Sequence, residues 1–410
     1  MGFKFNNGKS FTTSDGIPYI WQSGDETTPP SYVGMNTSPN ATSNGLFGYS
    51  VAVGSGRIVV GAPDETNTYN SAGRAHVYNL DGTLIKSITH PTPAASDQFG
   101  NSVAVGSGRI VVGAYADDIS GIQDVGSAHI YDLNGGYVGT ITHPSASESD
   151  LFGSSVAVGS GRIVVGAWND DTGRGSAHIY DLNGGYVGII TPPSADINDF
   201  FGWSVAVGSG RIVVGVPEDV IGTLNDAGSA HIYDLNGGYV GIITHPSAAA
   251  GDEFGRSVAV GSGKIVVGAP LDNTSGLLGA GSAHIYDLNG GYVGIITHPS
   301  AAANDQFGYS VAVGSGRIVV GAYLDDIGIG LTNAGSAHIY DLNGNYVGIL
   351  THPSAAAEDY FGNSVAVGSG RIVVGVPRDH IGALSDAGSA HIYSTPNVYT
   401  LYDGIDLNYS

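Results

Sequence analysis

One fifteen-residue stretch occurs seven times along the chain, and it constrains the fold more than any other feature. It is first complete at residues 47–61, FGYSVAVGSGRIVVG, and its phenylalanine recurs every 49 to 54 residues. A period of this length, kept seven times, is typical of repeat architectures, in which each unit buries its apolar faces only against its neighbours. The seven copies of the phenylalanine are Phe47, Phe99, Phe152, Phe201, Phe254, Phe307 and Phe361.

Each copy contains four short segments with the character of β-strands. The first two are rich in Val and Ile and are joined by Gly-Ser-Gly, and the last two are joined by a turn that usually contains Asn-Gly. Asn-Gly is a strong hairpin signal, and no helical period appears. Strands that are apolar on both faces need a layer on either side, which blades packed around an axis supply. We therefore expect an all-β fold, a seven-bladed β-propeller of four-stranded antiparallel blades.

The two ends of the chain indicate how the ring closes. Residues 31–39 align without a gap on residues 291–299, where a fourth strand is expected, whereas the seventh copy has no clear fourth strand of its own. We predict that residues 31–39 close the ring beside residues 390–393; the competing strand is residues 398–402. The expected organisation is an N-terminal arm over residues 1–30, a propeller over 31–393 and a C-terminal tail over 394–410. The arm is interpreted either as a disordered leader or as an attachment arm.

The variation in loop length distinguishes the two faces of the ring. All of it falls between the second and third strands of each copy, so one face is free to change. We call this the top face; in an antiparallel blade it also carries the connections between blades. Its loops hold most of the acidic residues, whereas the arginines of the opposite, bottom face are nearly balanced by aspartates. Most of the net charge of −22 is therefore predicted to lie on the top face.

Composition excludes several classes of function. An acidic chain with few Lys and Arg does not suit nucleic acid, and the absence of Cys excludes disulfides and thiolate metal sites. No apolar run is long enough to span a membrane, and residues 1–21 lack the continuous apolar core of a secretory signal peptide. We predict no metal site and no cofactor.

The order of motifs resembles a known family. Phe47-Gly48 followed by residues 61–63, Gly-Ala-Pro, resembles the FG-GAP repeat of integrin alpha-chain propellers and of related bacterial and viral proteins, and residues 254–270 match in the same way. The resemblance covers residues 31–393. It implies a seven-bladed propeller closed by an N-terminal strand, with a role in binding or adhesion. Many members carry a calcium loop between the first two strands, but this chain has only Gly-Ser-Gly-Arg there, so no calcium site is carried over.

Residues that recur in every copy are interpreted as structural. The phenylalanines are expected to pack between blades, and the aspartate two residues before most of them is expected to cap backbone amides. The histidine of each third strand lies on a different blade, too far from its copies to share a metal. Catalysis needs a unique set of converging groups, and the Ser, His and Asp of this chain are spread around the ring instead. We therefore expect a protein that is not an enzyme.

Binding is expected where the sevenfold symmetry breaks. The third copy has the shortest variable loop, beginning at Trp168, and the fourth copy carries Trp203. An exposed Trp beside Asp and Arg suits stacking against a sugar, although a Trp that fills the gap under a short loop is the stronger alternative. Paired aspartates bind a divalent ion weakly at best and are more often solvated. The candidate binding residues of the top-face loops are Trp168, Asp170, Asp171, Arg174, Trp203, Asp117, Asp118, Asp325, Asp326 and His380.

Two functional hypotheses follow. The first is a phage or other virion appendage protein that docks on another structural protein through residues 1–30 and turns its acidic top face outward toward a host surface or glycan. The second is a secreted or cell-surface adhesin of the integrin-like propeller type. An enzyme is the least favoured alternative.

Overall fold

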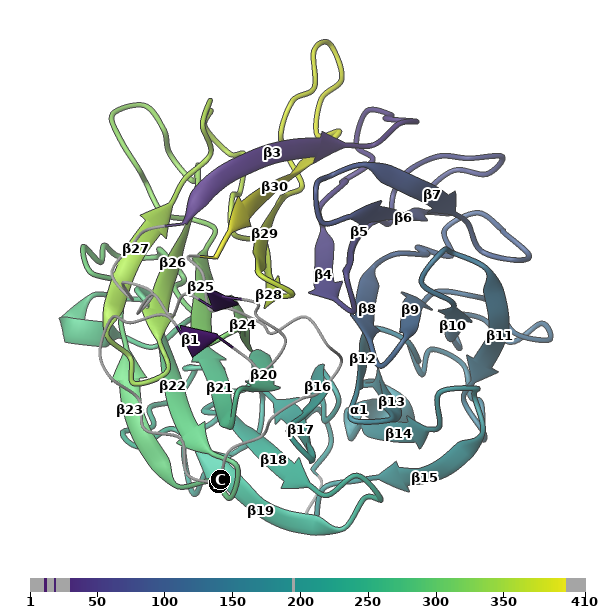
Figure 1. Cartoon of the computed structure of the whole chain (residues 1–410). Coiled ribbons are helices and arrows are strands. Elements are labelled where there is room, and N and C mark those ends of the chain that lie inside the picture. The colour runs from purple at the N-terminus through teal and green to yellow at the C-terminus, as the bar shows by residue number, and fades with distance from the viewer. Residues whose placement is uncertain (1–10, 13–17, 20–29, 194–195, 396–410) are drawn as a thin grey trace.

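The computed structural model describes residues 11–12, 18–19, 30–193 and 196–395. Seven four-stranded antiparallel sheets stand as blades around a central channel, which confirms the predicted seven-bladed propeller (Figure 1). In each blade the strands follow one another from the channel outward, and we name them A, B, C and D in that order. Strands B and C are almost wholly buried, because a neighbouring blade covers each of their faces.

Every blade has one strand in each of the positions A, B, C and D. Blades 1 to 4 consist of β4 (Ser50–Gly54), β5 (Arg57–Ala62), β6 (Arg74–Asn79), β7 (Leu84–Ile88); β8 (Ser102–Gly106), β9 (Arg109–Ala114), β10 (Ser127–Tyr131), β11 (Tyr137–Thr142); β12 (Ser155–Gly159), β13 (Arg162–Ala167), β14 (Ser176–Tyr180), β15 (Tyr186–Ile190); and β16 (Ser204–Gly208), β17 (Arg211–Val216), β18 (Ser229–Tyr233), β19 (Tyr239–Thr244). Blades 5 to 7 consist of β20 (Ser257–Gly261), β21 (Lys264–Ala269), β22 (Ser282–Asp287), β23 (Tyr292–Ile296); β24 (Ser310–Gly314), β25 (Arg317–Ala322), β26 (Ser336–Asp341), β27 (Tyr346–Leu350); and β28 (Ser364–Gly368), β29 (Arg371–Val376), β30 (Ser389–Ser394), β3 (Ser31–Thr37).

The ring is closed by the N-terminal strand β3, as the sequence predicts. It pairs antiparallel with β30, with Ser31 opposite Ser394 and Thr37 opposite Ser389. The competing strand, residues 398–402, lies outside the described residues. So does most of the predicted arm and tail. Within the arm the described residues are Pro30 and the two-residue strands β1 (Phe11–Thr12) and β2 (Pro18–Tyr19), which pair with each other.

The repeated phenylalanine packs in the seam between two blades. Phe47 is fully buried in a cluster that joins Val373 and Ile392 of blade 7 to Ile58 and Val60 of blade 1. The other six phenylalanines are equally buried, and each lies in a cluster shared by two neighbouring blades. The structural interpretation of these residues is therefore confirmed.

Neighbouring blades also approach each other closely near the channel. Ser50 Oγ of blade 1 donates a hydrogen bond to Gly100 O of blade 2 at 2.8 Å, and Gly61 lies against the same carbonyl. A Cβ at Gly61 would collide with that oxygen, so a larger residue would push the blades apart. This contact explains why every B strand carries a Gly at this position.

On the bottom face the repeated arginines connect one blade to the next. Arg57 Nε donates to Leu133 O at 2.8 Å, and a second guanidinium nitrogen donates to Asn134 Oδ1 at 3.2 Å. The same contact returns at three further seams, and Arg371 makes it to Leu80 O across the closing seam at 2.9 Å. These arginines thus bond the turns of neighbouring blades, rather than only balancing the aspartates there.

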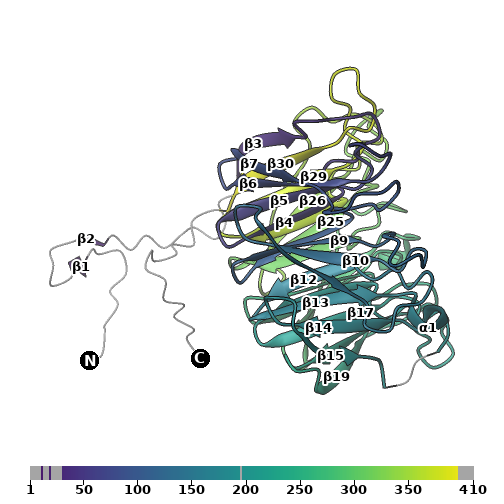
Figure 2. The same ribbon diagram turned by 90° about the vertical axis from the view of Figure 1, so that its right-hand side faces the viewer.

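The top face carries the B–C loops and the connections between blades, and the side view shows the loops projecting on this side (Figure 2). The short loop of blade 3 forms the turn α1 (Asp170–Gly173), and the loop of blade 5 contains the turn η1 (Thr274–Gly276). The bottom face, where β3 begins and β30 ends, carries the tight A–B and C–D turns.

Truncation of the N-terminus tests the closure. A chain that begins at Ser31 keeps β3 and should retain the melting temperature of the full chain. A chain that begins at Pro39 loses β3 and exposes β30, and its free energy of unfolding should fall by on the order of 5 kcal/mol, because two or three apolar side chains lose their cover. Thermal unfolding followed by circular dichroism measures both. Equal melting temperatures for the two truncated chains would contradict the assignment of β3 as the closing strand.

Candidate functional site

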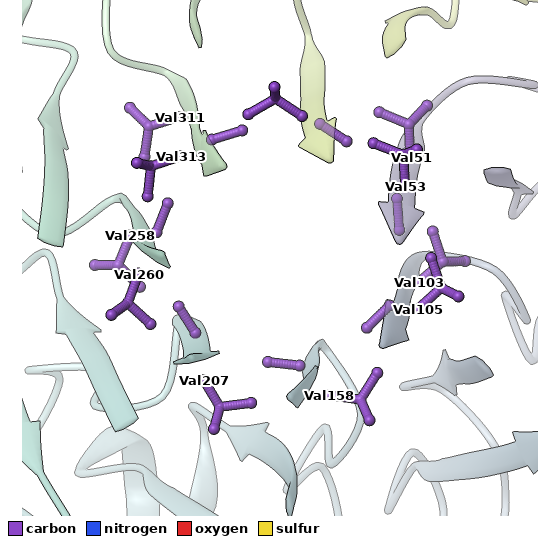
Figure 3. A pocket seen from close by; sticks show the side chains of 18 of the residues that line it. Val51, Val53, Val103, Val105, Val158, Val207, Val258, Val260, Val311 and Val313 are labelled. Carbon is purple, nitrogen blue, oxygen red and sulfur yellow. The ribbon is translucent and has the colours of Figure 1, made fainter. Parts of the chain in front are cut away.

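The central channel is lined by apolar side chains from all seven A strands. Each blade contributes a Val-Ala-Val run, such as residues 51–53, and these side chains surround the opening (Figure 3). Because all seven runs are the same, the wall of the channel has no feature that distinguishes one blade from another. The wall offers no polar side chain to fix the orientation of a ligand.

The rim of the channel on the top face varies from blade to blade, with five residue types at its seven equivalent positions. It is formed by the residue that follows each Phe-Gly pair, next to a ring of seven serines. The rim residues of blades 1 to 7 are Tyr49, Asn101, Ser154, Trp203, Arg256, Tyr309 and Asn363. The repeat fixes where these side chains lie but leaves their identity free, so the rim is a place where the sequence breaks the symmetry of the fold.

Aromatic rings gather on one side of this rim. Trp203 lies 5.2 Å from Trp168, ring centre to ring centre, and Phe200 lies 4.9 Å from Trp168. The guanidinium carbon of Arg256 lies 4.6 Å from the centre of the Trp203 ring, which is cation–π geometry. These four side chains come from blades 3, 4 and 5 and form one continuous cluster.

The cluster continues through the next two blades. Arg256 also lies 5.6 Å from the ring of Tyr309, which is 4.2 Å from Tyr323; Tyr323 is 5.3 Å from Tyr360. The guanidinium of Arg378 lies 4.6 Å from Tyr360. We call this series of contacts the aromatic arc; its members are Trp168, Phe200, Trp203, Arg256, Tyr309, Tyr323, Tyr360 and Arg378.

The electrostatics of the arc favour hydrogen-bond donors. Burial, together with the neighbouring Tyr309 and Tyr360, raises the pKa of the arc member Tyr323 to about 12, and burial with Tyr309 does the same for Tyr49, the rim residue of blade 1, which lies outside the arc. Both phenols therefore stay protonated at neutral pH. Arg256 is held over its rings by an ion pair with Glu253 at 2.7 Å. The arc thus combines ring surfaces with phenol and guanidinium donors.

The structure brings the two predicted tryptophans together but separates them from part of the predicted site. Trp168 and Trp203 are both half-buried against other rings. Each therefore fills space beneath the loops and also leaves part of its ring exposed to a ligand. Asp171 and Arg174 pair with each other at 3.0 Å on the loop surface. The members of the arc from Arg256 onward were not among the predicted residues. Aligning the residue after each Phe-Gly pair is the signal that finds Arg256 and Tyr309.

The first aspartate of each predicted pair is not solvated, which corrects the sequence interpretation. Asp117 and Asp325 are buried, and Asp170 is largely so; each lies within 3.3 Å of a histidine Nε2. The second aspartates are exposed: Asp118 Oδ1 accepts the backbone N–H of Asp124 at 3.0 Å, and Asp326 Oδ1 accepts that of Asn333 at 2.8 Å.

The remaining candidate, His380, lies apart from these contacts. It is exposed, and its Nδ1 lies 3.1 Å from the carbonyl oxygen of Arg378. The aspartate that stands two residues before six of the seven phenylalanines has the predicted capping role; Asp97 Oδ2, for example, accepts the backbone N–H of Ala94 at 2.6 Å.

A buried cluster of His, Asp, Ser and His crosses most seams beneath the top face, and we call it the His–Asp clasp. At the seam of blades 1 and 2, His90 Nε2 lies 3.1 Å from Asp117 Oδ2, and Ser127 Oγ donates to the same oxygen at 2.6 Å. His129 Nε2 lies 2.8 Å from Ser127 Oγ. His90 follows strand D of one blade, whereas the other three residues belong to the next blade, so the clasp ties two blades together.

The clasp offers His and Asp ligand atoms within 4.8 Å of one another at five seams, which raises the question of a metal ion. The hydrogen bonds do not fit one. The backbone N–H of Thr92 donates to His90 Nδ1 at 3.2 Å, so in the neutral ring the proton is on Nε2, which faces Asp117. A metal bound at Nε2 would need the lone pair on that atom. The same backbone contact is made at the other four seams.

The clasp also differs from the Ser-His-Asp arrangement of hydrolases. Ser127 stands between the other two groups, donating to Asp117 and lying within hydrogen-bond distance of His129. In a catalytic triad the histidine lies between the serine and the aspartate. Ser127 is moreover fully buried, as are its counterparts in blades 3 to 7. The clasp is therefore arranged to join blades, not to attack a substrate.

The comparison with known families agrees with this geometry. The sequence model of the FG-GAP repeat matches six stretches that together cover more than half of the chain: residues 83–131, 137–180, 186–233, 240–286, 293–340 and 346–393. The chain belongs to the FG-GAP repeat family. Each match runs from strand D of one blade to strand C of the next, and the first three strands of blade 1 lie outside the matches although they form a complete blade with β7. No curated protein matches this FG-GAP chain.

Two seams of this FG-GAP propeller lack the usual clasp. At the seam of blades 3 and 4 the histidine is replaced by Pro192, and the pKa of Asp219 is raised by burial. Burial also raises the pKa of Asp199, there to about 6. At the closing seam Ser38 takes the place of the histidine and donates to Glu65 at 3.0 Å, while His76 Nε2 lies 3.0 Å from the same carboxylate.

Burial of carboxylates changes what the top face of the propeller presents. Ten acidic residues of this face are buried in clasps or caps: Glu65, Asp97, Asp117, Asp150, Asp199, Asp252, Asp305, Asp325, Asp359 and Asp379. The acidic top face stays a prediction, but these carboxylates contribute little to its surface. In the part of the FG-GAP chain that the structure describes, no helix is long and apolar enough to cross a membrane.

The two histidines of a clasp respond to pH in opposite directions. Burial, assisted by the nearby His90, lowers the pKa of His129 to about 3, and four equivalent histidines have the same value. Burial also acts to lower the pKa of His90, but the hydrogen bond and charge of Asp117 outweigh it, and that pKa is raised. The same holds for His143 and His352.

These shifts predict a stability maximum near neutral pH. The third-strand histidines bind protons only when the chain unfolds, so stability should fall as the pH drops from about 6.5 toward 3; Asp199 and the other caps with a raised pKa oppose this in part. His90, His143 and His352 hold protons more tightly when folded, so stability should also fall as the pH rises through their folded pKa. Melting temperatures measured from about pH 4.5 to about pH 8.5, a span around the ordinary histidine pKa, test the fall in stability on both the acid and the alkaline side. A profile that rises steadily toward acid would contradict the assignment.

Proposed function

We propose that this FG-GAP propeller is a binding module, not an enzyme, and that it holds a carbohydrate against the aromatic arc at the mouth of its channel. The observation that carries the proposal is the uneven rim: Trp203, Arg256 and Tyr309 line the mouth at blades 4 to 6, whereas the rim residues of blades 2, 3 and 7 are the small polar residues Asn101, Ser154 and Asn363. A ligand site needs a unique set of groups, and the arc is such a set in an otherwise repeated fold.

The chemistry of the arc supports a carbohydrate. Sugars present apolar C–H faces that pack on aromatic rings and hydroxyls that pair with polar groups, and Trp and Tyr combine both properties. Arg256 and Arg378 each lie over a ring and still carry several N–H donors. The wall of the channel below is apolar, so a sugar would rest on the rim instead of entering the bore.

The absence of converging catalytic groups at the arc supports binding over catalysis. The described groups of the arc are rings, phenols and guanidinium ions. Of the carboxylates near it, Glu253 is paired with Arg256, and burial, with the charges of Asp226 and Glu253, raises the pKa of Glu218. The buried Ser, His and Asp of the clasps are repeated and lie beneath the surface. A reaction would require a nucleophile or base that reaches a bound ligand.

Substitution of Trp203 tests the carbohydrate proposal. Trp203→Ala should weaken binding of an oligosaccharide by roughly 30-fold, because truncating a central aromatic residue typically costs about 2 kcal/mol. The matched controls are Asn101→Ala and Ser154→Ala, which change the same rim position in other blades. Binding is first measured on an array of neutral and acidic oligosaccharides. The affinity for any ligand found on the array is then measured by tryptophan fluorescence. Equal binding by Trp203→Ala and the wild type would exclude the arc as the site.

We further propose that the protein is a component of a virion, anchored through residues 1–30 to another structural protein with the aromatic mouth turned outward. What supports this is the position of Ser31: it pairs with Ser394 at the bottom face, opposite the arc. An anchor that leads into Ser31 therefore leaves the mouth free for a host surface or glycan. The alternative, a secreted or cell-surface adhesin, uses the same mouth with a different attachment.

The anchoring proposal is tested by the chain that begins at Ser31. This chain keeps β3 and the whole propeller, so its failure to enter particles would reflect the missing arm and not a loss of folding. We expect the full chain to co-purify with particles and the shortened chain to remain free, as measured by quantitative mass spectrometry of purified virions. Equal incorporation of the two chains would contradict anchoring through residues 1–30, and recovery on cell surfaces but not on particles would favour the adhesin.

A further inference from the structure

The seam between blades 3 and 4 keeps the receiving side of a His–Asp clasp without the histidine. Pro192 occupies the place of the histidine in the sequence, whereas Asp199, Asp219 and Ser229 of the receiving side are all retained. The closing seam also lacks this histidine, but there Glu65 is surrounded by a serine, an arginine and a histidine. At the seam of blades 3 and 4, no described Lys, Arg or His forms an ion pair with either aspartate.

An intact clasp shows what kind of group belongs between these two aspartates. His90 lies between two carboxylates, with its Nδ1 3.7 Å from Asp97 and its Nε2 3.1 Å from Asp117, and the clasp of blades 2 and 3 is arranged in the same way. Asp199 and Asp219 are the equivalents of this pair. The chain itself therefore places a ring with N–H donors, and a capacity for positive charge, in the position that is left open here.

The backbone beside Pro192 does not shift to fill the gap. Tyr233 donates to Thr191 O at 3.2 Å, and the equivalent tyrosine makes this contact at an intact clasp at the same distance. The proline ring is shorter than a histidine side chain and carries no N–H, so it cannot act as a donor between the carboxylates. Asp219 is partly exposed, so a small solute can reach its carboxylate from the top face.

His231 is a second, independent observation that points to a ligand. Only 3% of it is exposed, yet its Nδ1 has no partner and its Nε2 forms no hydrogen bond to a described residue. In five other blades the Nε2 of the equivalent histidine lies 2.8 to 3.1 Å from a serine of the clasp. Nδ1 faces strand D, as the 2.8 Å contact between His129 and Thr140 shows, so Nε2 of His231 faces the gap. Burial lowers the pKa of His231 to about 4, so its neutral ring can accept an N–H.

We propose that this gap, which we call the vacant clasp, binds a protonated amine whose N–H groups bond to Asp199, Asp219 and Nε2 of His231. Two carboxylates and a neutral imidazole select a cation that carries several donors, and an ammonium group is such a cation. A metal ion fits less well: His and Asp ligand atoms lie within 4.8 Å of one another at five seams of the described chain, and this seam is not among them. The bound amine takes the part of the missing histidine and joins blades 3 and 4. The vacant clasp is a different site from the aromatic arc.

The ammonium ion is the smallest probe of the vacant clasp. The melting temperature of the full chain should be higher by about 2 °C or more in ammonium chloride than in potassium chloride at the same concentration, because a ligand of the folded chain stabilises it. Methylammonium tests a small organic amine, and glucosamine, with N-acetylglucosamine as its control, tests the amino group of a sugar. A rise with any of these amines over potassium supports the proposal and identifies the source of the amine. Equal melting temperatures in all of these solutions would overturn it.

Three variants locate the effect at this seam. Pro192→His restores the sequence Thr-His-Pro-Ser of the intact clasps and supplies the imidazole from the chain itself, so it should raise the melting temperature in potassium chloride and abolish the further rise with ammonium. Asp219→Asn should also lose the ammonium response, because one of the two charges is gone. The matched control, Asp272→Asn in the intact clasp of blades 4 and 5, should keep it. A response that persists in both Pro192→His and Asp219→Asn, or that disappears in Asp272→Asn, would overturn the proposal.

Discussion

Burial of a strand on both faces is the constraint on which the rest of this structure depends. Strands B and C are apolar on both sides, so no blade is stable by itself and each must be covered by two neighbours. The seam between blades is therefore the real unit of the fold. Phe47 and its copies fill it, Ser50 and Gly61 bring the backbones together near the axis, and Arg57 and the His–Asp clasps join its bottom and top ends. These contacts hold each blade in one position relative to the next.

A fold defined by repeated seams leaves only a few positions free for function. The rim residue after each Phe-Gly pair points to the mouth whatever its side chain is, because the backbone around it is fixed by the seam. Evolution of such a site needs no new loop, only different residues at equivalent positions of several blades. The aromatic arc has this character: Trp203, Arg256 and Tyr309 occupy the same position in three successive blades.

The fold could be predicted from the sequence because its signals are periodic. The spacing of the phenylalanines indicates the number of blades, and the unpaired strand at residues 31–39 indicates the closure. The candidate site could be predicted only in part, because contacts between copies depend on which residues face each other across a seam. Trp168 and Trp203 stand out as departures from the repeat, but nothing in the sequence places Arg256 over Trp203. The clasp could not be predicted for the same reason. His90 and His129 belong to different blades, and the sequence of a single blade does not show that the two side chains meet.

The closing strand has a consequence for the order in which the protein assembles. Ser31 and Ser394 bond to each other although they are 363 residues apart in the chain. During synthesis β3 leaves the ribosome first, yet its partner β30 is almost the last segment to appear, so β3 waits without a partner while the other blades form. The loop that must close is long, but its entropic cost grows only with the logarithm of its length. The seventh blade is thus completed last, and the pairing of β3 with β30 closes the open row of blades into a ring.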